Sequence, residues 1–305
     1  MEKKKNGDQV MTARFVNPYT DFGFKKLFGE EASKDLLIDF LNELLPIEHK
    51  IVSLTFQNPE KLGVAAAERK AIFDIHCEDE KGGRFVVEIQ KAKIRFFKDR
   101  AVFYTTFPIR EQAEKGDWNF KLNPIYCVAI LDFTFGDERP QKDYVSNVRL
   151  KDQYCQVFYE KLTYIFIEMP RFVKKANELE NHFDKWLYFL KNLEDFEDIP
   201  DILKEDVFIK GFEIAEIANF DEQQLRAYEE SLKVYRDLKG VVDTSFEEGK
   251  VEGIQEGMER GKAEGMEKGK TEKALEMARM MKQEGEPTEK ISHYTGLTPR
   301  EIEKL

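Results

Sequence analysis

Alternation of apolar and polar residues with a period of two marks two neighbouring strands in the first half of the chain. They read Lys-Ala-Ile-Phe-Asp-Ile-His-Cys-Glu at 70–78 and Arg-Phe-Val-Val-Glu-Ile-Gln-Lys at 84–91, with polar residues and two glycines between them. A loop of this length and composition is typical of a β-hairpin. A turn centred on Lys81 places Asp74 opposite Glu88, about 5 Å apart at Cβ.

The two faces of this predicted hairpin differ in chemistry. Side chains alternate along a strand, so Gln90 shares the face of Asp74 and Glu88. The other face is predicted to enter a core and consists of Phe73, Ile75, Phe85, Val87 and Ile89. Two carboxylates this close repel each other, and a cation with oxygen ligands such as Mg²⁺ relieves the repulsion. Because Asp is depleted in strands, an exposed strand aspartate is the weaker interpretation of Asp74.

Similar periodicities predict the other elements. We expect helices at 33–45, 95–113, 172–194, 208–219 and 221–238, and strands at 51–56, 125–131 and 163–167. Up to residue 133 the order is helix, three strands, helix, strand. The continuous apolar strand at 125–131 is typical of burial on both faces of a sheet. Pro108 lies inside one expected helix and should kink it.

Glycine recurs every four residues from Gly249 to Gly269, among Glu, Lys and Met. A step of four advances about 400° around a helix, so the glycines form a slowly turning stripe. Each glycine costs a helix about 1 kcal/mol relative to Ala. Close contact with a second copy and a solvated charged arm both remain open as interpretations. Three short helices are expected after it, at 274–284, 288–294 and 299–305, forming a packing or dimerisation module rather than a DNA-reading helix-turn-helix.

The bulk composition predicts one main domain with a helical extension. The chain has 305 residues, of which 41% are hydrophobic, enough to bury a sizeable core. The predicted organisation is a flexible tail at 1–12, a core at 13–195, a helical extension at 196–244, a glycine-periodic helix at 245–272 and a small helical module at 273–305. Without a membrane-length apolar run or a secretory signal, a cytoplasmic location is expected. The three cysteines are expected to be buried reduced thiols: Cys77, Cys127 and Cys155.

The net charge of −11 argues against nucleic-acid binding by the chain as a whole, because such binding usually relies on Lys and Arg. However, residues 1–133 carry 21 Lys and Arg against 21 Asp and Glu, so the excess acid lies in the remainder. Salt screens charges beyond about 8 Å, so the local balance matters more than the total. Residues 84–100 hold six basic and two acidic side chains. This local excess of positive charge suits an anionic partner such as nucleic acid, and the residues placed to contact it are Lys91, Lys93, Arg95, Lys98, Arg100 and Tyr104.

Several motifs occur in a fixed order. They are Asn-Pro-Tyr-Thr-Asp-Phe-Gly-Phe-Lys-Lys-Leu-Phe-Gly at 17–29, Asp74, Glu-Ile-Gln at 88–90, a basic helix with Arg100 and Tyr104, the strand 124–133, Ile-Glu-Met-Pro-Arg-Phe at 167–172 and Lys-Trp-Leu-Tyr-Phe-Leu at 185–190. In this order the chain resembles, over nearly its whole length, the bacterial Rpn recombination-promoting nucleases, also called PD-(D/E)XK nuclease family transposases. The resemblance implies a restriction-endonuclease-like α/β fold, αβββαβ with a mixed sheet and a helical C-terminal extension. It also implies a DNA endonuclease that uses Mg²⁺ or Mn²⁺.

The same resemblance implies a set of site residues. Asp74, Glu88 and Gln90 would be catalytic, and Asp74, Glu88, the Ile89 carbonyl and Asp21 would bind the metal. Asp21 could equally be the N-cap of a helix at 22–28. Gln90 occupies the lysine position of the superfamily, which removes a positive charge but leaves a group able to orient water or bind a phosphate oxygen.

Other residues near the hairpin have weaker assignments. Lys70 could replace the missing charge, whereas Lys91 should point to the opposite face if the strand stays regular. His76 is interpreted as structural. Arg100 and Tyr104 lie one helical turn apart, so they could contact the DNA backbone, brace Gln90 or form structural hydrogen bonds.

The favoured interpretation is a metal-dependent DNA endonuclease that hydrolyses phosphodiester bonds in recombination or transposition. It is expected to form a homo-oligomer and to need neither a membrane nor an organic cofactor. The alternative is a catalytically degenerate nuclease fold that binds DNA or protein and oligomerises through its C-terminal helices.

Overall fold

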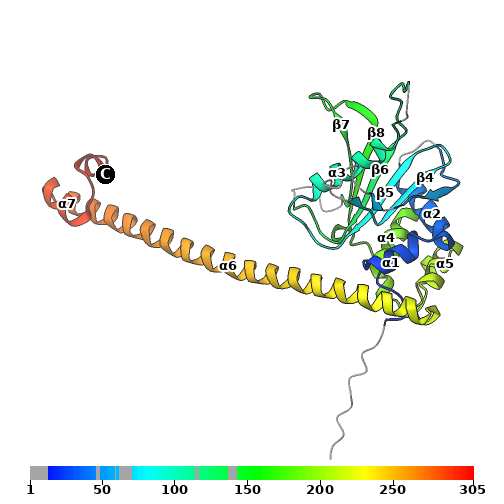
Figure 1. Ribbon diagram of the computed structural model, residues 1–305. Coiled ribbons are helices and arrows are strands. Elements are labelled where there is room, and N and C mark those ends of the chain that lie inside the picture. Colours follow the sequence, from blue (N-terminus) through cyan, green and yellow to red (C-terminus); the bar gives the residue numbers. More distant parts are fainter. Residues whose placement is uncertain (1–12, 46–48, 59, 62–70, 114–116, 137–142) are drawn as a thin grey trace, which may run out of the picture. The chain divides into compact units, whose positions relative to one another are not determined.

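The computed structural model describes residues 13–45, 49–58, 60–61, 71–113, 117–136 and 143–305 (Figure 1). The predicted tail at 1–12 and Lys70 lie outside these ranges. The chain forms two compact units, residues 1–240 and 241–305. The domain boundaries predicted above remain predictions.

A mixed six-stranded sheet organises the first unit, as expected for the predicted fold class. Its order is β1-β4-β5-β6-β8-β7, with β5, β6 and β8 parallel to one another and the other pairs antiparallel. The strands are β1 (Leu54–Phe56), β4 (Ile75–Asp79), β5 (Arg84–Gln90), β6 (Ile125–Leu131), β7 (Val145–Lys151) and β8 (Val157–Glu168). The apolar segment predicted at 125–131 is confirmed as β6, which lies inside the sheet between β5 and β8.

The β4–β5 hairpin has the predicted register. Ile75 pairs with Val87 and Glu78 with Arg84, so the turn is centred on Lys81. Gly82 takes φ of +81°, a conformation that glycine adopts without the steric cost of a side chain. The pairing therefore continues toward Asp74 and Glu88 at the open end of the hairpin.

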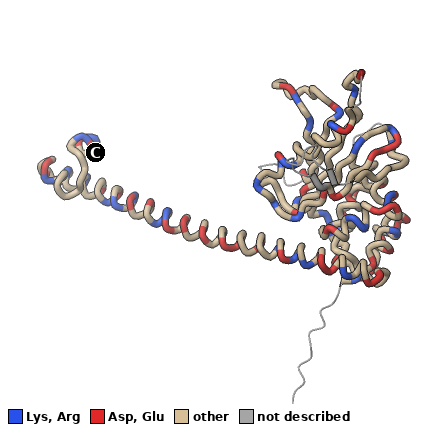
Figure 2. The backbone as a smooth tube through the Cα atoms, viewed as in Figure 1, with Lys and Arg blue, Asp and Glu red and all other residues tan. Residues whose placement is uncertain are grey.

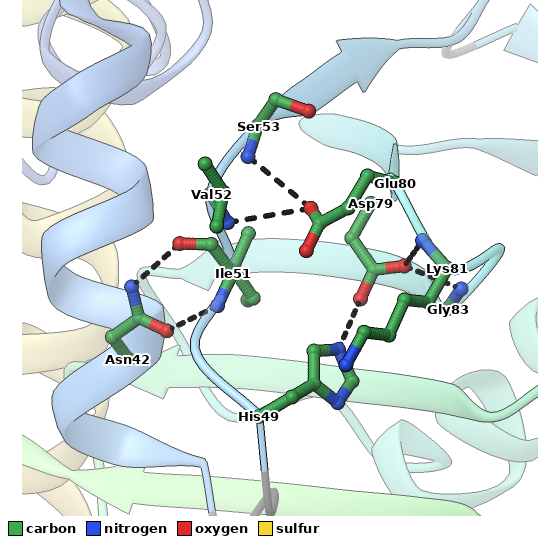
Figure 3. Close-up of polar contacts among 9 residues, drawn as sticks. All are labelled: Asn42, His49, Ile51, Val52, Ser53, Asp79, Glu80, Lys81 and Gly83. Atoms are coloured by element: carbon green, nitrogen blue, oxygen red, sulfur yellow. Dashed lines mark hydrogen bonds and ion pairs between the residues drawn. The ribbon is translucent and has the colours of Figure 1, made fainter.

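Two carboxylates of the turn hold it in place (Figure 3). Asp79 accepts hydrogen bonds from the backbone N–H groups of Lys81 at 2.9 Å and Gly83 at 2.8 Å. Its other oxygen lies 3.2 Å from His49 Nε2. Glu80 accepts from backbone N–H groups of the segment just before β1, at 3.3 and 3.2 Å. The turn is thus tied to the preceding chain, which fixes the hairpin register.

Helices cover both faces of the sheet (Figure 1). On one face lie α1 (Asp21–Phe28), α2 (Lys34–Leu44), α4 (His182–Asn192) and α5 (Asp206–Ala215). Their apolar side chains and those of the sheet, including Ile75, Val87 and Ile89, form the main core. On the other face α3 (Phe97–Arg110) buries Phe97 and Ala101 against residues of β6 and β8. The predicted order αβββαβ is confirmed as α2, β1, β4, β5, α3 and β6.

Phe73 is a correction to the predicted hairpin. It lies in a small cluster with Val86, Tyr104 and Phe107, not in the main core. The chain bends at Asp74, and β4 begins only at the next residue. The period-two alternation therefore stops before Phe73. The residues just upstream pair instead as a separate two-stranded sheet of β2 (Glu60–Lys61) and β3 (Ala71–Ile72).

Several predicted helix boundaries are also wrong. The helix expected at 172–194 is α4, which begins ten residues later because Asn181 caps it by accepting from the Asp184 N–H at 2.7 Å. The helices expected at 221–238 and 274–284 belong to one helix, α6 (Glu222–Gln283), which includes all six periodic glycines. Of the three expected terminal helices, only α7 (Thr288–Thr295) and α8 (Pro299–Glu303) are separate.

The C-terminal end of α6 has a small core of its own. Ala278 packs with Ile291 of α7 and Ile302 of α8. Lys282 donates to the backbone carbonyl of Ile302 at 2.9 Å. Figure 2 shows acidic and basic residues interspersed along the rest of α6. Neither α6 nor another helix in the described ranges is long and apolar enough to cross a membrane.

Two of the three cysteines are buried as predicted, whereas Cys155 is exposed. It lies in the turn between β7 and β8, where its φ is +63°. Such turns lie at the surface because their backbone groups need water or local partners. The expectation of burial is therefore wrong for Cys155.

Candidate active site

The carboxylates of Asp74 and Glu88 meet where the hairpin opens. Asp74 lies at the bend before β4, and Glu88 lies in β5. The backbone N–H of Asp74 donates to Glu88 Oε1 at 3.2 Å. In the other direction, the N–H of Ile89 donates to Asp74 Oδ2 at 2.7 Å. Each carboxylate is thus oriented by a backbone group of the opposite segment, and the predicted proximity of the two side chains is confirmed.

Both acids resist ionisation in this environment. Burial raises the pKa of Glu88 well above its usual range, and the neighbouring Asp74 charge raises it further. Burial also raises the pKa of Asp74, although the hydrogen bond from Ile89 opposes that change. Glu88 is only 6% exposed. A buried pair with two raised pKa values stores repulsion that a bound cation would remove.

Arg100 is the nearest cation from α3. Its Nη2 lies 3.5 Å from Glu88 Oε2, and its Nη1 lies 3.5 Å from Gln90 Oε1. The guanidinium also lies 4.8 Å from the ring centroid of Tyr104, one helical turn along. Gln90 is held from its other end, because its Nε2 donates to the Ala92 carbonyl at 3.0 Å. The predicted bracing of Gln90 by Arg100 is therefore present.

The N-terminus of α1 brings a second pair of charges. Thr20 caps this helix by accepting from the Gly23 N–H at 3.0 Å, so the interpretation of Asp21 as the N-cap is wrong. Asp21 is the first helical residue and forms an ion pair with Lys25 at 3.0 Å. The charge of Asp21 raises the pKa of Asp74, and the charge of Lys25 lowers it. Only burial and the hydrogen bond from Ile89 affect that pKa more than Asp21 does. The start of α1 therefore lies beside the carboxylate pair.

Sequence reasoning missed Lys25. The charge of Lys25 lowers the pKa of Glu88 as well. Burial, the charges of Asp74 and Arg100, and the hydrogen bond from the Asp74 N–H each have a larger effect on that pKa. The available signal was its spacing, because a lysine four residues after Asp21 lies on the same face of the helix. What the pattern could not give is the packing of α1 beside the open end of the hairpin. Lys70, the predicted replacement for the missing lysine, lies outside the described residues.

The donor set fits a hard divalent cation. Among the residues that the structure describes, no group of three His, Cys, Asp or Glu side chains is arranged to hold a metal. Mg²⁺ commonly uses one or two carboxylates and completes its shell with water and substrate phosphates. Asp74 and Glu88 provide such a pair, with charge that the surrounding chain compensates only in part. The roles of Asp21 and the Ile89 carbonyl as metal ligands stay predictions.

The predicted DNA contacts lie on α3 and on the loop before it. Lys93, Arg95 and Lys98 are exposed, whereas Arg100 is half-buried. Lys93 donates to the Phe135 carbonyl at 2.9 Å, and Lys98 lies 4.8 Å from the ring of the same residue. Lys93 and Lys98 therefore both lie beside Phe135, in the segment after β6.

Lys91 lies closer to the site than the strand alternation predicts. Burial lowers the pKa of this half-buried lysine, and the charges of Asp21 and Asp74 oppose that change. Because β5 ends at Gln90, the period-two alternation does not extend to Lys91. The lysine is therefore within electrostatic range of the acids rather than isolated from them.

A sequence model of one protein family matches most of the chain. The family is described as PD-(D/E)XK nuclease family transposase, and the match extends over residues 18–245. It includes Asp21, Lys25, the hairpin with Asp74 and Glu88, and α3 with Arg100. No curated protein and no solved structure matches the chain.

Proposed function

The chain belongs to the PD-(D/E)XK nuclease family transposases, and we propose that it is a metal-dependent DNA endonuclease that acts in recombination or transposition. The observation that carries this proposal is the buried Asp74–Glu88 pair, whose carboxyl groups both have raised pKa values. A scaffold gains nothing from two such acids side by side, whereas a cation site uses them as ligands. Because the proposed substrate is DNA, we expect the protein to act in the cytoplasm.

The two carboxylates are oriented before any ligand arrives. Asp74 is fixed by the Ile89 N–H, and Glu88 by the Asp74 N–H. Fixed oxygen ligands reduce the reorganisation needed for cation binding. When bound there, Mg²⁺ or Mn²⁺ supplies a Lewis acid that lowers the pKa of water and offsets phosphate charge.

The positive charge that would bind the substrate phosphate comes from residues other than Gln90. Gln90 is neutral, and both ends of its amide already have partners in Ala92 and Arg100. Arg100 presents a guanidinium fork, a geometry that matches phosphate oxygens. Lys25 adds a second cation from α1. We assign these two residues to the scissile phosphate, and Lys91, Lys93, Arg95 and Lys98 to the backbone beyond it.

The test is plasmid nicking by the full chain in Mg²⁺, Mn²⁺, Ca²⁺ or EDTA. We expect cleavage in Mg²⁺ or Mn²⁺, none in EDTA, and none by Glu88→Gln. A matched control is Glu229→Gln, the same chemical change at an exposed position of α6. The control should cleave as the wild type does. Cleavage that survives EDTA, or equal cleavage by Glu88→Gln, would overturn the proposal.

We also propose that α6 joins copies of this chain into a homo-oligomer. A Cβ added at any glycine of the stripe from Gly249 to Gly269 would meet no atom within 4 Å. Nothing in the described part of the chain therefore accounts for these glycines. Next to them, Val251, Ile254 and Met258 are 61%, 56% and 71% exposed. Small residues beside apolar ones suit close approach of a second helix, which would offset the low helix propensity of glycine.

Light scattering coupled to size exclusion tests the assembly. Gly257→Leu and Gly261→Leu should each lower the mass, although both raise intrinsic helix propensity. Ala263→Leu adds bulk about 200° around the helix from Gly261 and serves as the control. Unchanged mass with higher helicity by far-UV circular dichroism would instead identify α6 as a solvated arm.

A further inference from the structure

Two exposed phenylalanines flank Arg100 along α3. Phe96, just before the helix, is 63% exposed, and Phe103 is 44% exposed. At 100° per residue, Phe96, Arg100 and Phe103 fall within about 60° of one another around the helix axis. We call these three residues the α3 strip.

The exposure of these rings does not follow from the packing of α3. The helix buries Phe97, Ala101 and Thr105 on another face, and on the face of the strip it buries Phe107, one turn beyond Phe103. Single exposed apolar residues are common and need no explanation. Here, however, two rings lie on one face of a helix, one on each side of an arginine that contacts Glu88 and Gln90.

Cations accompany the rings throughout this part of α3. The Arg95 guanidinium lies 5.2 Å from the Phe96 ring centroid, and Arg100 lies 4.8 Å from that of Tyr104. Phe103 packs edge-on against Phe107, with the ring centroids 5.2 Å apart. Aromatic rings interleaved with cations are the combination that binds single-stranded nucleic acid, because bases stack on the rings and the cations follow the phosphates.

We propose that the α3 strip binds unpaired nucleotides, so that the substrate class is single-stranded or locally unpaired DNA. This inference rests on the proposed nuclease function. A phenyl ring cannot form the hydrogen bonds that read base edges in a groove, and in a duplex the base faces are covered by their neighbours. Unpaired bases expose both faces to Phe96 and Phe103.

The dimensions of the strip suit this substrate. Phe96 and Phe103 are seven positions apart along the chain, a rise of about 10 Å in a helix. Successive nucleotides of a stacked strand are about 3.4 Å apart. The two rings therefore receive bases about three steps apart, with Arg100 between them. A phosphate held by Arg100 lies next to Glu88, so the strand is gripped on both sides of the cleaved bond.

Fluorescence anisotropy with a labelled single-stranded oligonucleotide and its duplex tests this directly. The full chain carries Glu88→Gln so that it binds without cutting. Phe96→Leu combined with Phe103→Leu keeps apolar side chains but removes the rings. We expect at least about a tenfold loss of single-strand affinity, within the range measured for loss of a stacked base, and a change of less than about twofold for the duplex.

Two further variants separate stacking from other effects. Phe158→Leu removes an 80% exposed ring from β8 and should change neither affinity. Phe96→Trp with Phe103→Trp should retain single-strand binding, because indole also stacks. The inference is overturned if the double leucine variant leaves single-strand binding intact, or weakens both DNA forms equally. It is also overturned if the chain binds no DNA.

Cleavage distinguishes this inference from the proposed function. One possible result is that the chain with native Glu88 nicks plasmid, while the chain with Phe96→Leu and Phe103→Leu binds both DNA forms normally. In that case only the strip assignment fails. If the chain never cleaves yet its single-strand binding still depends on Phe96 and Phe103, the strip assignment stands and the nuclease proposal fails.

Discussion

Two buried acids of the first unit, Asp184 and Glu88, are treated very differently by their surroundings. The side chain of Asp184 is fully buried. It accepts from the Tyr144 hydroxyl at 2.7 Å, from Lys174 Nζ at 2.8 Å and from a backbone N–H at 2.9 Å. Glu88 accepts one backbone N–H at 3.2 Å, and its cation, Arg100, remains at 3.5 Å.

The pKa values of these acids shift in opposite directions. Burial favours a higher pKa for Asp184, but hydrogen bonds from Lys174, the Glu180 N–H and Tyr144 outweigh it and lower the pKa below its usual range. Burial and the Asp74 charge raise the pKa of Glu88, and Arg100 only partly opposes them. Burial alone therefore does not mark a functional acid. The distinguishing feature is a buried carboxylate pair whose charge the protein leaves undercompensated.

The largest expected contrast between the two sites is in catalysis. Asp74→Asn should lower the Mg²⁺-dependent nicking rate at least about a thousandfold, equivalent to about 4 kcal/mol of activation free energy. Asp184→Asn, assayed at a temperature where it is folded, should nick DNA at nearly the wild-type rate. Circular dichroism confirms folding of both variants. An Asp74→Asn protein that keeps a tenth of the wild-type rate would show that this pair is not the catalytic centre.

For the stability of the fold, we expect the larger effect at Asp184 rather than at Asp74. Asp184→Asn should reduce the free energy of unfolding by about 3 kcal/mol at pH 7, because it leaves Lys174 without its buried partner. Urea denaturation measures this change. A lowered pKa stabilises the fold above the unfolded-state value of about 3.9, and that stabilisation is lost as the pH falls through the native pKa. The difference from wild type should therefore shrink between pH 5 and pH 3, and a constant difference would contradict the assignment.

The sequence was sufficient for the hairpin because its information is local. Turn composition and period-two alternation determine which residue faces which, so the proximity of Asp74 and Glu88 follows without tertiary knowledge. The bend that removes Phe73 from the main core depends on packing beneath α3. The ion pair of Asp21 with Lys25 is visible as a spacing, yet its place beside Asp74 depends on how α1 docks. Long-range packing is what periodicity cannot supply.

Cation binding should stabilise only one of the two sites. At a Mg²⁺ or Mn²⁺ concentration a hundred times the dissociation constant, the native state gains about 2.7 kcal/mol. Thermal unfolding should show this as a higher melting temperature for the wild type and for Asp184→Asn, but not for Asp74→Asn. If no divalent cation shifts the wild type, the catalytically degenerate binding module becomes the better account of this chain.

Without metal, neutralising Glu88 should stabilise the fold. A raised pKa means that the folded protein holds a proton that the unfolded chain has released, so stability falls as the pH rises above the unfolded value of about 4.3. Glu88→Gln removes that dependence and should gain about 1 kcal/mol at pH 8 in EDTA. Melting temperatures between pH 5 and pH 8 test this. A variant less stable than wild type at pH 8 would show that Arg100 already compensates Glu88 fully.

The smallest expected effect comes from making the Glu88 site resemble that of Asp184. Gln90→Lys adds a cation on the same strand face as Glu88. The new lysine would stand to Glu88 as Lys174 stands to Asp184. The added charge should favour both the ionised carboxylates and the developing charge on the phosphate. We expect the Mg²⁺-dependent rate to be kept or raised by about threefold, equivalent to about 0.7 kcal/mol. A drop of more than about tenfold in the same nicking assay would mean that the Gln90 amide, held by Ala92 and Arg100, has a geometric role that an ammonium group cannot replace.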